Sequence, residues 1–559
     1  MSLMSSLYLG VSGLQTSNNA LNTTAHNMSN LDTTGYTRQQ VAQDTRSYIT
    51  ISKNQTTSWQ QLGLGVRYSQ TRQVRDYFLD KNYRRESGRS AFYEVSYNAM
   101  EEIENILGES YEGHEFSLSI TDLWDAVEEL SKNPTLPVNQ NLFVTRAYEF
   151  ITKATAVYDS LCDYQDNMNK IVKTDVDTIN AYAQEIEKLN VQIAKIEGGV
   201  EHANDLRDRR NYILDELSKL GEVSYAENIE GYVSVRFEGV DLVKGSLINK
   251  ISLYTDPYTG FYTPYWEMFA NYAFDEYGNK YLPEESLDSA KVFDLKMTIS
   301  SDLNTDIGSL KSTLLARGDH HATAQELKDI NPDGEYEEGW YDINISQSII
   351  MNIEAEFDQL INAVVTKING ILKEAAEAET KLYPDSTYLR DKNGEPYQLF
   401  EQIIENNKTY TLPDGTVVEC GWNVGNIEVN MDLRQNPTLL KFRLHDSSED
   451  NATMEKLKTA FEESIYTLNP NVQTPVCFGD YYKNLVAQVA NSGSVFHDIM
   501  ESQEITVDSL FSAREQVIGV SSDEELTNMI MYQNAYNASS RYINVISEML
   551  EHILTSLGR

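Results

Sequence analysis

The residues best suited to metal chemistry are two adjacent histidines, His320 and His321, which follow Asp319. Imidazole nitrogens and carboxylate oxygens are ordinary ligands of zinc and related ions. Side chains that are neighbours in sequence point apart on a helix or a strand, however, and no third ligand lies at a helical offset from this pair. The pattern therefore favours surface histidines, and the sequence predicts no metal site.

A second candidate for ion binding is the stretch DKNGE at 391–395, which resembles part of a calcium-binding loop. A loop of that kind ends on a glutamate that binds the ion with both oxygens, and its glycine has a fixed place. Here Gly394 comes too early, and Gln402 falls where the glutamate is required. We therefore expect a plain Asn-Gly turn.

The sequence has no pattern typical of a catalytic centre. It contains no glycine-rich phosphate loop, no G-x-S-x-G elbow and no HExxH motif. The basic cluster RDRR at 207–210 lies in an acidic helix and predicts a solvated, salt-bridged face, and the aromatic run at 254–274 predicts packing in a β-rich core. The cysteines lack metal or redox spacing and are expected to be small buried side chains; they are Cys162, Cys420 and Cys477. The chain is therefore predicted to assemble rather than to catalyse, without a cofactor.

Composition limits the partners and the compartment. The chain has 559 residues, enough for roughly three or four domains, and a formal net charge of −40. This charge argues against nucleic acid and anionic membranes as partners, and no stretch approaches the ~20 apolar residues of a membrane span. Residues 1–31 carry no Lys, Arg, Asp or Glu, whereas a secretory signal begins with a basic region. We therefore expect either a cytoplasmic protein or export without a cleaved Sec signal.

Two heptad patterns, one at each end of the chain, are the elements that would organise such an assembly. The N-terminal pattern mixes leucine with small residues at Leu7, Gly10, Leu14, Ser17, Leu21, Thr24 and Met28. The C-terminal pattern is more apolar and runs through Met529, Tyr532, Tyr536, Ser539, Ile543, Ile546, Leu550, Ile553 and Leu557. Alternating steps of three and four residues are typical of helices that pack along a seam. Two such helices can meet only if everything between them forms an excursion.

The segments inside the two ends also read as helices and then give way to strands. Amphipathic patterns predict helices at 83–107, 117–132, 140–220 (broken at Gly198-Gly199) and 480–516. Alternation and Val/Ile content predict strands and hairpins over 231–256, and a helix returns at 345–378, before turns and short strands at 379–480. The predicted fold is α+β and multidomain. Its N- and C-terminal helices pair as a coiled-coil or bundled stalk, and β-rich outer domains are inserted in the middle.

The stretch AHNMSNLDTTGYTRQQ at 25–40 carries a family resemblance. It resembles the N-terminal motif of the flagellar axial proteins, the family of rod, hook and hook-associated proteins, with the motif positions at Asn27, Asn30, Gly35, Tyr36, Arg38 and Gln39. The C-terminal stretch at 523–554 resembles the matching terminal helix, with Tyr532, Gln533, Ala535, Tyr536, Ala538 and Met549 at its motif positions. Further stretches at 62–80, 123–135, 204–220, 230–245 and 425–440 resemble the hook-associated members that join hook and filament. The likeness covers roughly 1–250 and 425–559.

The resemblance implies a structural, extracellular role at the junction of hook and filament. The implied partners are other copies of the chain in a ring, hook protein, a second junction protein, an export chaperone and the flagellar export apparatus. The motif residues at 27–39 would serve assembly, with Tyr36 and Arg38 at an inter-subunit contact or, alternatively, at a helix stop within one subunit. The seam at Met529, Tyr532, Gln533, Tyr536, Ile543, Ile546, Leu550, Ile553 and Leu557 would serve assembly, and the chaperone would cover Ile543 to Leu557.

Four domains are predicted from these patterns. They are terminal inner-core helices at 1–60 with 520–559, a helical bundle at 61–225 with 480–519, a β-rich outer domain at 226–344 and a mixed outer domain at 345–479. The ends, at about 1–60 and 523–559, are expected to be disordered in the monomer, because an isolated helix of this composition is marginal. The alternatives are a hook or distal rod subunit, an axial scaffold carrying a carbohydrate-binding or enzymatic insertion at 254–424, and a cytoplasmic coiled-coil protein.

Overall fold

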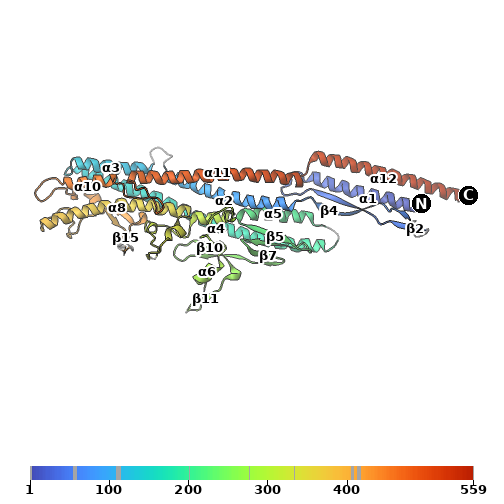
Figure 1. Cartoon of the computed structure of the whole chain (residues 1–559), viewed down its shortest axis with the longest axis horizontal. Helices are drawn as coiled ribbons and strands as arrows, with labels where there is room; N and C mark the ends of the chain where they lie inside the picture. The colour runs from blue at the N-terminus through green and yellow to red at the C-terminus, as the bar shows by residue number, and fades with distance from the viewer. Residues whose placement is uncertain are drawn as a thin grey trace.

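The molecule is elongated, with long helices running along its axis (Figure 1). The computed structural model describes residues 3–53, 59–108, 115–199, 202–275, 277–332, 334–404, 408–411 and 417–557. Both termini lie at one end of the molecule, and small sheets project sideways from its middle. The paired ends and the excursion between them are therefore confirmed.

The described residues form mostly helices and some short strands. The helices are α1 (Leu3–Ser29), α2 (Tyr77–Leu107), α3 (Phe116–Lys132), α4 (Pro137–Glu197), α5 (Asn204–Leu220), α6 (Glu284–Ala290), α7 (Ser309–Arg317), α8 (Ile349–Leu382), α9 (Met431–Gln435), α10 (Asn451–Glu462), α11 (Phe478–Ile518) and α12 (Ser522–Leu557). Short 3₁₀ turns lie at Glu267–Phe269, Glu326–Lys328, Val424–Asn426 and Pro437–Leu439, and a π turn lies at Tyr341–Ile345. Within this part of the chain, no helix has an apolar stretch long enough to span a membrane.

The strands pair antiparallel in small sheets. They are β1 (Gln39–Thr45), β2 (Ile49–Lys53), β3 (Trp59–Leu62), β4 (Val66–Gln73), β5 (Val223–Glu227), β6 (Val233–Phe237), β7 (Val240–Lys244), β8 (Leu247–Ile248), β9 (Ile251–Thr255), β10 (Tyr262–Trp266), β11 (Ala273–Phe274), β12 (Lys280–Tyr281), β13 (Phe400–Gln402), β14 (Lys408–Thr411), β15 (Val417–Cys420) and β16 (Ile427–Val429). The largest sheet in the described residues is the four-stranded meander β5-β6-β7-β8. The inserted part thus has less β structure than its turn-rich sequence suggests.

Local signals set the ends of several helices. Asp76 caps α2, since its side chain accepts hydrogen bonds from Phe78 N and Leu79 N, and Gly108 ends the same helix with a left-handed φ of 73°. Pro137 opens α4, which continues for 61 residues to the expected break at Gly198. A helix of that length extends about 90 Å, which explains the rod-like shape.

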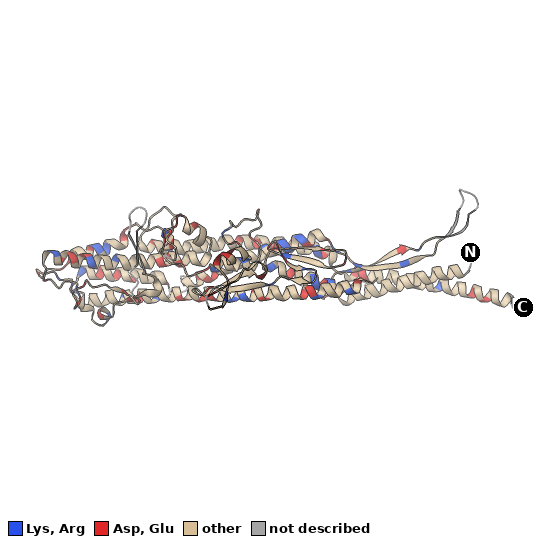
Figure 2. Ribbon diagram, turned by 90° about the horizontal axis from the view of Figure 1, so that it is seen from below, with Lys and Arg blue, Asp and Glu red and all other residues tan. Residues whose placement is uncertain are grey.

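Two helix pairs form the long axis of the molecule. α1 packs along α12 at the end that carries the termini, and α2 packs along α11 next to them. These are the nested terminal helices that the heptad patterns predict. Figure 2 shows few charged residues on α1 and α12 and many on the helices of the bundle.

The two largest hydrophobic cores of the described residues hold most of the helices and strands outside the terminal pair. The larger core joins α2, α3, α4, α8, α10 and α11, and it contains Phe116, Phe150 and Phe357 in ring contact, with centroids 5.2 to 5.5 Å apart. The second core lies between the C-terminal half of α4, α5 and the strands from β6 to β9. Residues 349–376 of α8 thus share a core with α3 and α4, across the predicted division at 345. The domain division itself stays a prediction.

Four of the described helices were not predicted from the sequence: the short helices α6 and α9, and the helices α7 and α10. α7 has its residues 310–317 buried on every side, so it lacks the amphipathic alternation by which helices are recognised. α10 is short and lies in a stretch dominated by turn residues; Asp450 caps it by accepting a hydrogen bond from Thr453 N. The sequence predicts strands or turns where α7 and α10 lie, and both of these helices pack into the interior.

Three other sequence interpretations are corrected or refined by the structure. The cluster at 207–210 is not a solvated face throughout, because Asp208 and Arg210 are buried. The aromatic run at 254–274 is split, since Trp266 is buried whereas Tyr258 is 95 % exposed. The stretch at 391–395 is the expected turn, since Asp391 accepts hydrogen bonds from Asn393 N and Glu395 N and Gly394 has a φ of 86°.

A candidate assembly site at the paired termini

Asn27 is the centre of the motif at 27–39. It lies at the end of α1, where its Nδ2 donates to the carbonyl of Gln39 (2.9 Å) and to Glu525 Oε2 (3.2 Å). Its Oδ1 accepts from Tyr36 OH (2.8 Å) and from Gln39 N (3.1 Å). The asparagine is buried and uses both ends of its amide, so it fixes the chain that leaves α1 against α12.

The turn between α1 and β1 depends on a glycine. Gly35 has a φ of 77°, in the left-handed region that favours glycine, and a Cβ built on it would lie 3.4 Å from Tyr212. Asn30 ends α1 by donating from its side chain to the carbonyl of His26 (3.0 Å) and by accepting from Thr33 Oγ1 (3.2 Å). The turn returns Tyr36 to Asn27 and places the residues that follow beside α5.

Arg38 joins the two ends of the chain. Its Nε donates to Glu525 Oε1 (2.9 Å), its Nη1 lies 3.0 Å from Glu524 Oε2, and its backbone N donates to the carbonyl of Ile518 (2.8 Å). The Glu525 side chain is only 2 % exposed, so its carboxylate depends on Arg38 and Asn27. These contacts hold the start of α12 where α11 ends.

Gln39 connects the same turn to α5. Its Nε2 donates to Asp205 Oδ1 (3.2 Å), and its Oε1 accepts from Asn204 Nδ2 (3.2 Å). The structure thus brings together Asn27, Tyr36, Arg38 and Gln39 within one subunit, next to the Gly35 turn. A contact of Tyr36 or Arg38 with a neighbouring subunit stays a prediction.

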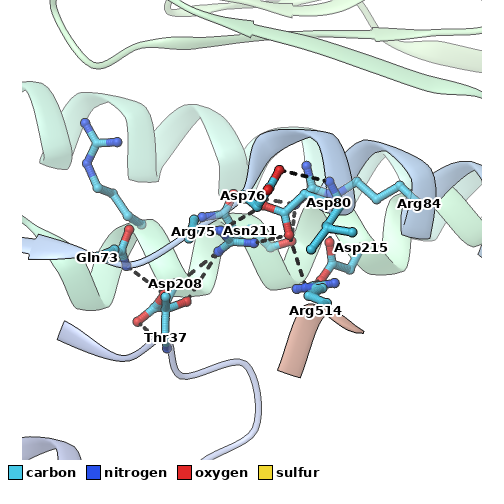
Figure 3. Close-up of polar contacts among 12 residues, drawn as sticks. Thr37, Gln73, Arg75, Asp76, Asp80, Arg84, Asp208, Asn211, Asp215 and Arg514 are labelled. Carbon is cyan, nitrogen blue, oxygen red and sulfur yellow. Dashed lines mark hydrogen bonds and ion pairs between the residues drawn. The ribbon is translucent and has the colours of Figure 1, made fainter. Parts of the chain in front are cut away.

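A ladder of alternating charges continues from the motif into the helical bundle (Figure 3). We call it the joint ladder, and it consists of Asp208, Arg75, Asp80, Arg514, Asp215 and Arg84. Asp215 bridges two arginines, Arg84 Nε at its Oδ1 and Arg514 Nη2 at its Oδ2, both at 2.6 Å. Asp80 bridges Arg514 Nε (3.1 Å) and Arg75 Nε (2.9 Å).

The joint ladder links elements that are far apart in sequence. Asp80 and Arg84 lie on α2, Asp208 and Asp215 on α5, and Arg514 on α11. At its end, Asp208 Oδ2 accepts from Thr37 N (3.2 Å), one residue before Arg38. The ladder thus connects the pair α1–α12 to the helical bundle, and its three cations and three anions balance.

Burial and neighbouring charges shift the pKa values of these groups in different directions. Burial favours a higher pKa for Asp215, but the guanidinium groups of Arg84 and Arg514 outweigh it, and its pKa lies below the usual value. Burial raises the pKa of Asp208 to about 6, against the hydrogen bonds from Thr37 and the charge of Arg75. Burial and the nearby carboxylates also raise the pKa of Tyr36, so this phenol stays a hydrogen-bond donor to Asn27.

The C-terminal seam faces α1. Ile546 is buried, and the seam residues Met529, Tyr532, Tyr536, Ile543 and Leu550 are half-buried. Two glycines of α1 allow the close approach: a Cβ on Gly10 would lie 2.7 Å from Ile543 Cγ1, and one on Gly13 would lie 2.8 Å from Ser539 Oγ. Gln533 and Ile553 are exposed, and the side chain of Leu557 lies outside the described residues. The heptad pattern therefore predicted the packed face of α12.

The sequence did not reveal the partners of the motif. The acidic residues at the start of α12 suit the positive end of the helix dipole, and Ser521 and Ser522 are of the residue type that caps helices. Ser521 does act as a cap, since its Oγ accepts from Glu524 N (3.5 Å), but the side chain of Glu525 turns to Arg38 and Asn27. The cluster at 207–210, for which the sequence predicts a solvated face, contains Asp208, the acidic residue at the α5 end of the joint ladder.

The histidine pair is half-buried rather than on the surface. His320 lies between two carboxylates, with its Nδ1 2.6 Å from Asp319 Oδ1 and its Nε2 2.7 Å from Glu326 Oε1. His321 faces a different set of residues, as expected for neighbours in sequence. Both histidines lie in the loop after α7. This loop packs against α8, so both side chains are partly buried.

Comparison with known proteins gives consistent relatives along the whole chain. The family described as "Flagellar hook-associated protein FlgK helical domain" matches residues 100–271. The families of the flagellar basal body rod proteins match residues 7–37 and, as the "FlgEFG protein C-terminal" family, residues 517–556. These last two matches cover α1 with the motif turn, and α12.

Full-length relatives carry one name. Flagellar hook-associated protein 1 of Bacillus subtilis is 26 % identical over 562 residues, covering 99 % of this chain and 99 % of that protein. The protein of the same name from Salmonella typhimurium is 23 % identical, covering 97 % of this chain and 98 % of that one. The structure of the flagellar hook junction protein FlgK from Burkholderia pseudomallei superposes with a TM-score of 0.53 at 12 % identity, over 78 % of this chain and all of that one, which is a likeness of fold. The matched terminal helices, the matched bundle and the full-length relatives together place the chain in the flagellar hook-associated protein 1 family.

Proposed function

We propose that copies of this chain form a ring at the tip of the hook, with α1 and α12 building the inner wall. As a member of its family, the chain is a structural, extracellular part of the bacterial flagellum at the junction of hook and filament, and it is not an enzyme. The proposal concerns how it performs that role: which surfaces meet, and which neighbours they meet.

The observation that supports this proposal most directly is the apolar outer surface of the terminal pair. The inner seam of α12 is already covered by α1, yet apolar side chains remain exposed around the rest of both helices. They include Met4, Tyr8, Leu526, Ile530, Met531, Val545, Met549 and Leu554. A surface of this kind marks a protein–protein interface, and α1 carries no charged residue that would oppose packing.

The partners follow from the position in the flagellum. We infer that the lower face of the ring meets hook protein and the upper face meets the second junction protein. Neighbouring copies would cover the apolar outer surface and order helices that are marginal alone. Before assembly, a dedicated export chaperone would shield the stretch from Ile543 to Leu557, which an isolated subunit exposes in part.

The joint ladder suits a part that carries load between two domains. Three elements of the bundle meet there, and Thr37 connects them to the motif turn. Removing any one partner from a buried, hydrogen-bonded ionic network destabilises the fold strongly, because the charge left behind is uncompensated. We infer that the joint ladder keeps the inner wall at a fixed angle to the helical bundle.

The exposed surface of α12 can be tested directly. In a strain lacking the chain, the double variant Ile530→Asp, Met549→Asp is expected to be made and exported but not to attach filaments. The control Asn534→Asp adds a charge at an exposed polar position of the same helix and is expected to restore filaments. Normal filaments on the double variant would show that this surface is not an assembly interface.

A further inference from the structure

Three potential metal ligands meet in the helical bundle. Cys162 lies on α4, His321 in the loop after α7, and Glu354 on α8. One ligand atom from each lies within 4.8 Å of the other two. Cys162 Sγ is 3.9 Å from Glu354 Oε1, and His321 Nδ1 is 3.6 Å from the same oxygen. A thiol, an imidazole and a carboxylate thus converge from three separate elements.

The spacing is close to that of a tetrahedral zinc site. Zn²⁺ binds thiolate sulfur at about 2.3 Å and imidazole nitrogen or carboxylate oxygen at about 2.0–2.2 Å. Ligand atoms around a tetrahedral ion with these bonds are about 3.3–3.6 Å apart. The distances from Glu354 Oε1 are at or slightly above this range, so small rotations of the side chains would complete the geometry.

The surroundings orient two of the three ligands. Glu354 is fully buried, and its Oε2 accepts from Ala322 N (3.0 Å), which leaves Oε1 facing the thiol and the imidazole. The Nδ1 atom of His321 is buried and has no hydrogen-bonding partner among the described residues. Its ring rests edge-on against Phe261, with the centroids 5.4 Å apart. An outer contact that holds a ligand in place is a usual feature of metal sites.

The neighbouring polar groups are already engaged elsewhere. His320 is held between Asp319 and Glu326. Asp358, one turn along α8 from Glu354, accepts from Ala324 N (2.9 Å) and Val424 N (2.7 Å). The imidazole nitrogen that lacks a hydrogen-bonding partner therefore belongs to the cluster of Cys162, His321 and Glu354, in which Cys162 Sγ donates to Glu354 Oε1.

We propose that Cys162, His321 and Glu354 form a zinc-type transition-metal site that ties α4 and α8 to the loop after α7. A thiolate and an imidazole favour Zn²⁺ over the hard cations Ca²⁺ and Mg²⁺. On binding, the cysteine releases its proton to solvent, and the two anionic ligands balance the charge of the ion. Cys162 and His321 are partly exposed although His321 Nδ1 itself is buried, and a water molecule would supply the fourth ligand.

The site exists only when three elements of the bundle have met, so a bound ion would stabilise the folded bundle. The proposal does not depend on the role of the chain in the flagellum. The sequence predicts no metal site, because it shows no third ligand at a helical offset from His320 and His321. The ligands proposed here to join His321 are a cysteine and a glutamate that are 192 positions apart.

The test is metal binding by the full-length chain, purified without metal and then dialysed against micromolar Zn²⁺. We expect about one zinc per chain in the native protein and none in Cys162→Ser or His321→Ala. The controls Cys477→Ser and His497→Ala change the same residue types on or beside α11 and are expected to keep the ion. Equal zinc content in the native chain, Cys162→Ser and His321→Ala would overturn the proposal.

Cobalt gives a second readout that does not depend on the folding of Cys162→Ser or His321→Ala. Co²⁺ in place of zinc is expected to produce a thiolate-to-metal charge-transfer band in the native chain and in Cys477→Ser. Excess Zn²⁺ should abolish the band. A native chain that binds Co²⁺ without such a band, or that binds neither ion, would contradict ligation by Cys162.

Discussion

Arg38 Nε lies 2.9 Å from Glu525 Oε1, although the two residues are 487 positions apart. This ion pair joins the two ends of the chain, because it connects the turn after α1 to the start of α12. Glu525 is nearly fully buried, so it depends on this arginine and on Asn27. Within one subunit, the motif at 27–39 therefore connects the two ends of the chain.

Removing this fastening should weaken the junction. Arg38→Ala leaves the buried carboxylate of Glu525 without its cation. This should destabilise the contact between the turn at 27–39 and α12 by about 3 kcal/mol, which lowers the equilibrium constant for forming that contact by roughly a hundredfold. Strains carrying it are expected to lose filaments under mild shear and to release flagellin. Arg38→Lys should be intermediate, since a lysine cannot hold Glu524 and Glu525 with one planar fork.

The matched control for that experiment is Arg72→Ala. Arg72 lies on β4 and makes an exposed contact with Gln40 at 3.4 Å. Its loss should leave filament retention unchanged. If both arginine variants shed filaments equally, the ion pair with Glu525 would not be the reason.

A second prediction concerns Asp215 in the joint ladder. Asp215→Asn leaves Arg84 and Arg514 without their shared carboxylate and should destabilise the bundle near α5 by about 3 kcal/mol at pH 7. Hydrogen exchange of residues 204–220 in the full chain would show the loss. Asp498→Asn, at an exposed position of α11, should leave that exchange unchanged.

The effect of Asp215 should depend on pH in one direction. Its pKa is lower in the folded chain than the usual value of about 3.9, so the carboxylate contributes stability above that value. The contribution is lost as pH falls through the folded pKa. The native chain and Asp215→Asn are therefore expected to converge as the pH falls below the usual carboxyl pKa toward the lower folded pKa, and a difference that stays constant from neutral pH through this acidic range would refute this role.

A third prediction uses Gly10. Alanine normally favours a helix over glycine by about 1 kcal/mol, yet a Cβ at Gly10 would lie 2.7 Å from Ile543 Cγ1. Gly10→Ala should therefore weaken the α1–α12 pair and reduce filament retention. Gly370→Ala, at a position of α8 with no neighbour within 4 Å, should stabilise its helix. Improved retention with Gly10→Ala would mean that the two helices do not approach closely in the assembled junction.

A fourth prediction concerns the monomer in solution. Residues 1–60 and 523–559 should exchange their amide hydrogens far faster than α2 and α11, because the terminal helices are weak until neighbouring subunits cover them. Hydrogen exchange of the purified chain, followed by mass spectrometry, measures this contrast. Protection of α12 equal to that of α11 would show that the ends fold before assembly.

The sequence predicted the long helices well and their tertiary partners poorly. The alternating steps of three and four residues from Met529 to Leu557 predict which face of α12 packs against another helix, because a heptad pattern can be recognised within a single segment. The partners of Arg38, Asp215 and His321 are not local, since each lies more than a hundred positions away or across several elements. α7 was not predicted because a helix that is buried on all sides shows no amphipathic pattern in its sequence.

The most direct test of the account is deletion of this chain, followed by electron microscopy of the cell surface and an assay of flagellin in the medium. A junction protein predicts hooks of full length that carry no filament, with flagellin released outside the cell. Missing or truncated hooks would instead assign the chain to the rod or the hook, and intact filaments on motile cells would contradict a role at the junction altogether.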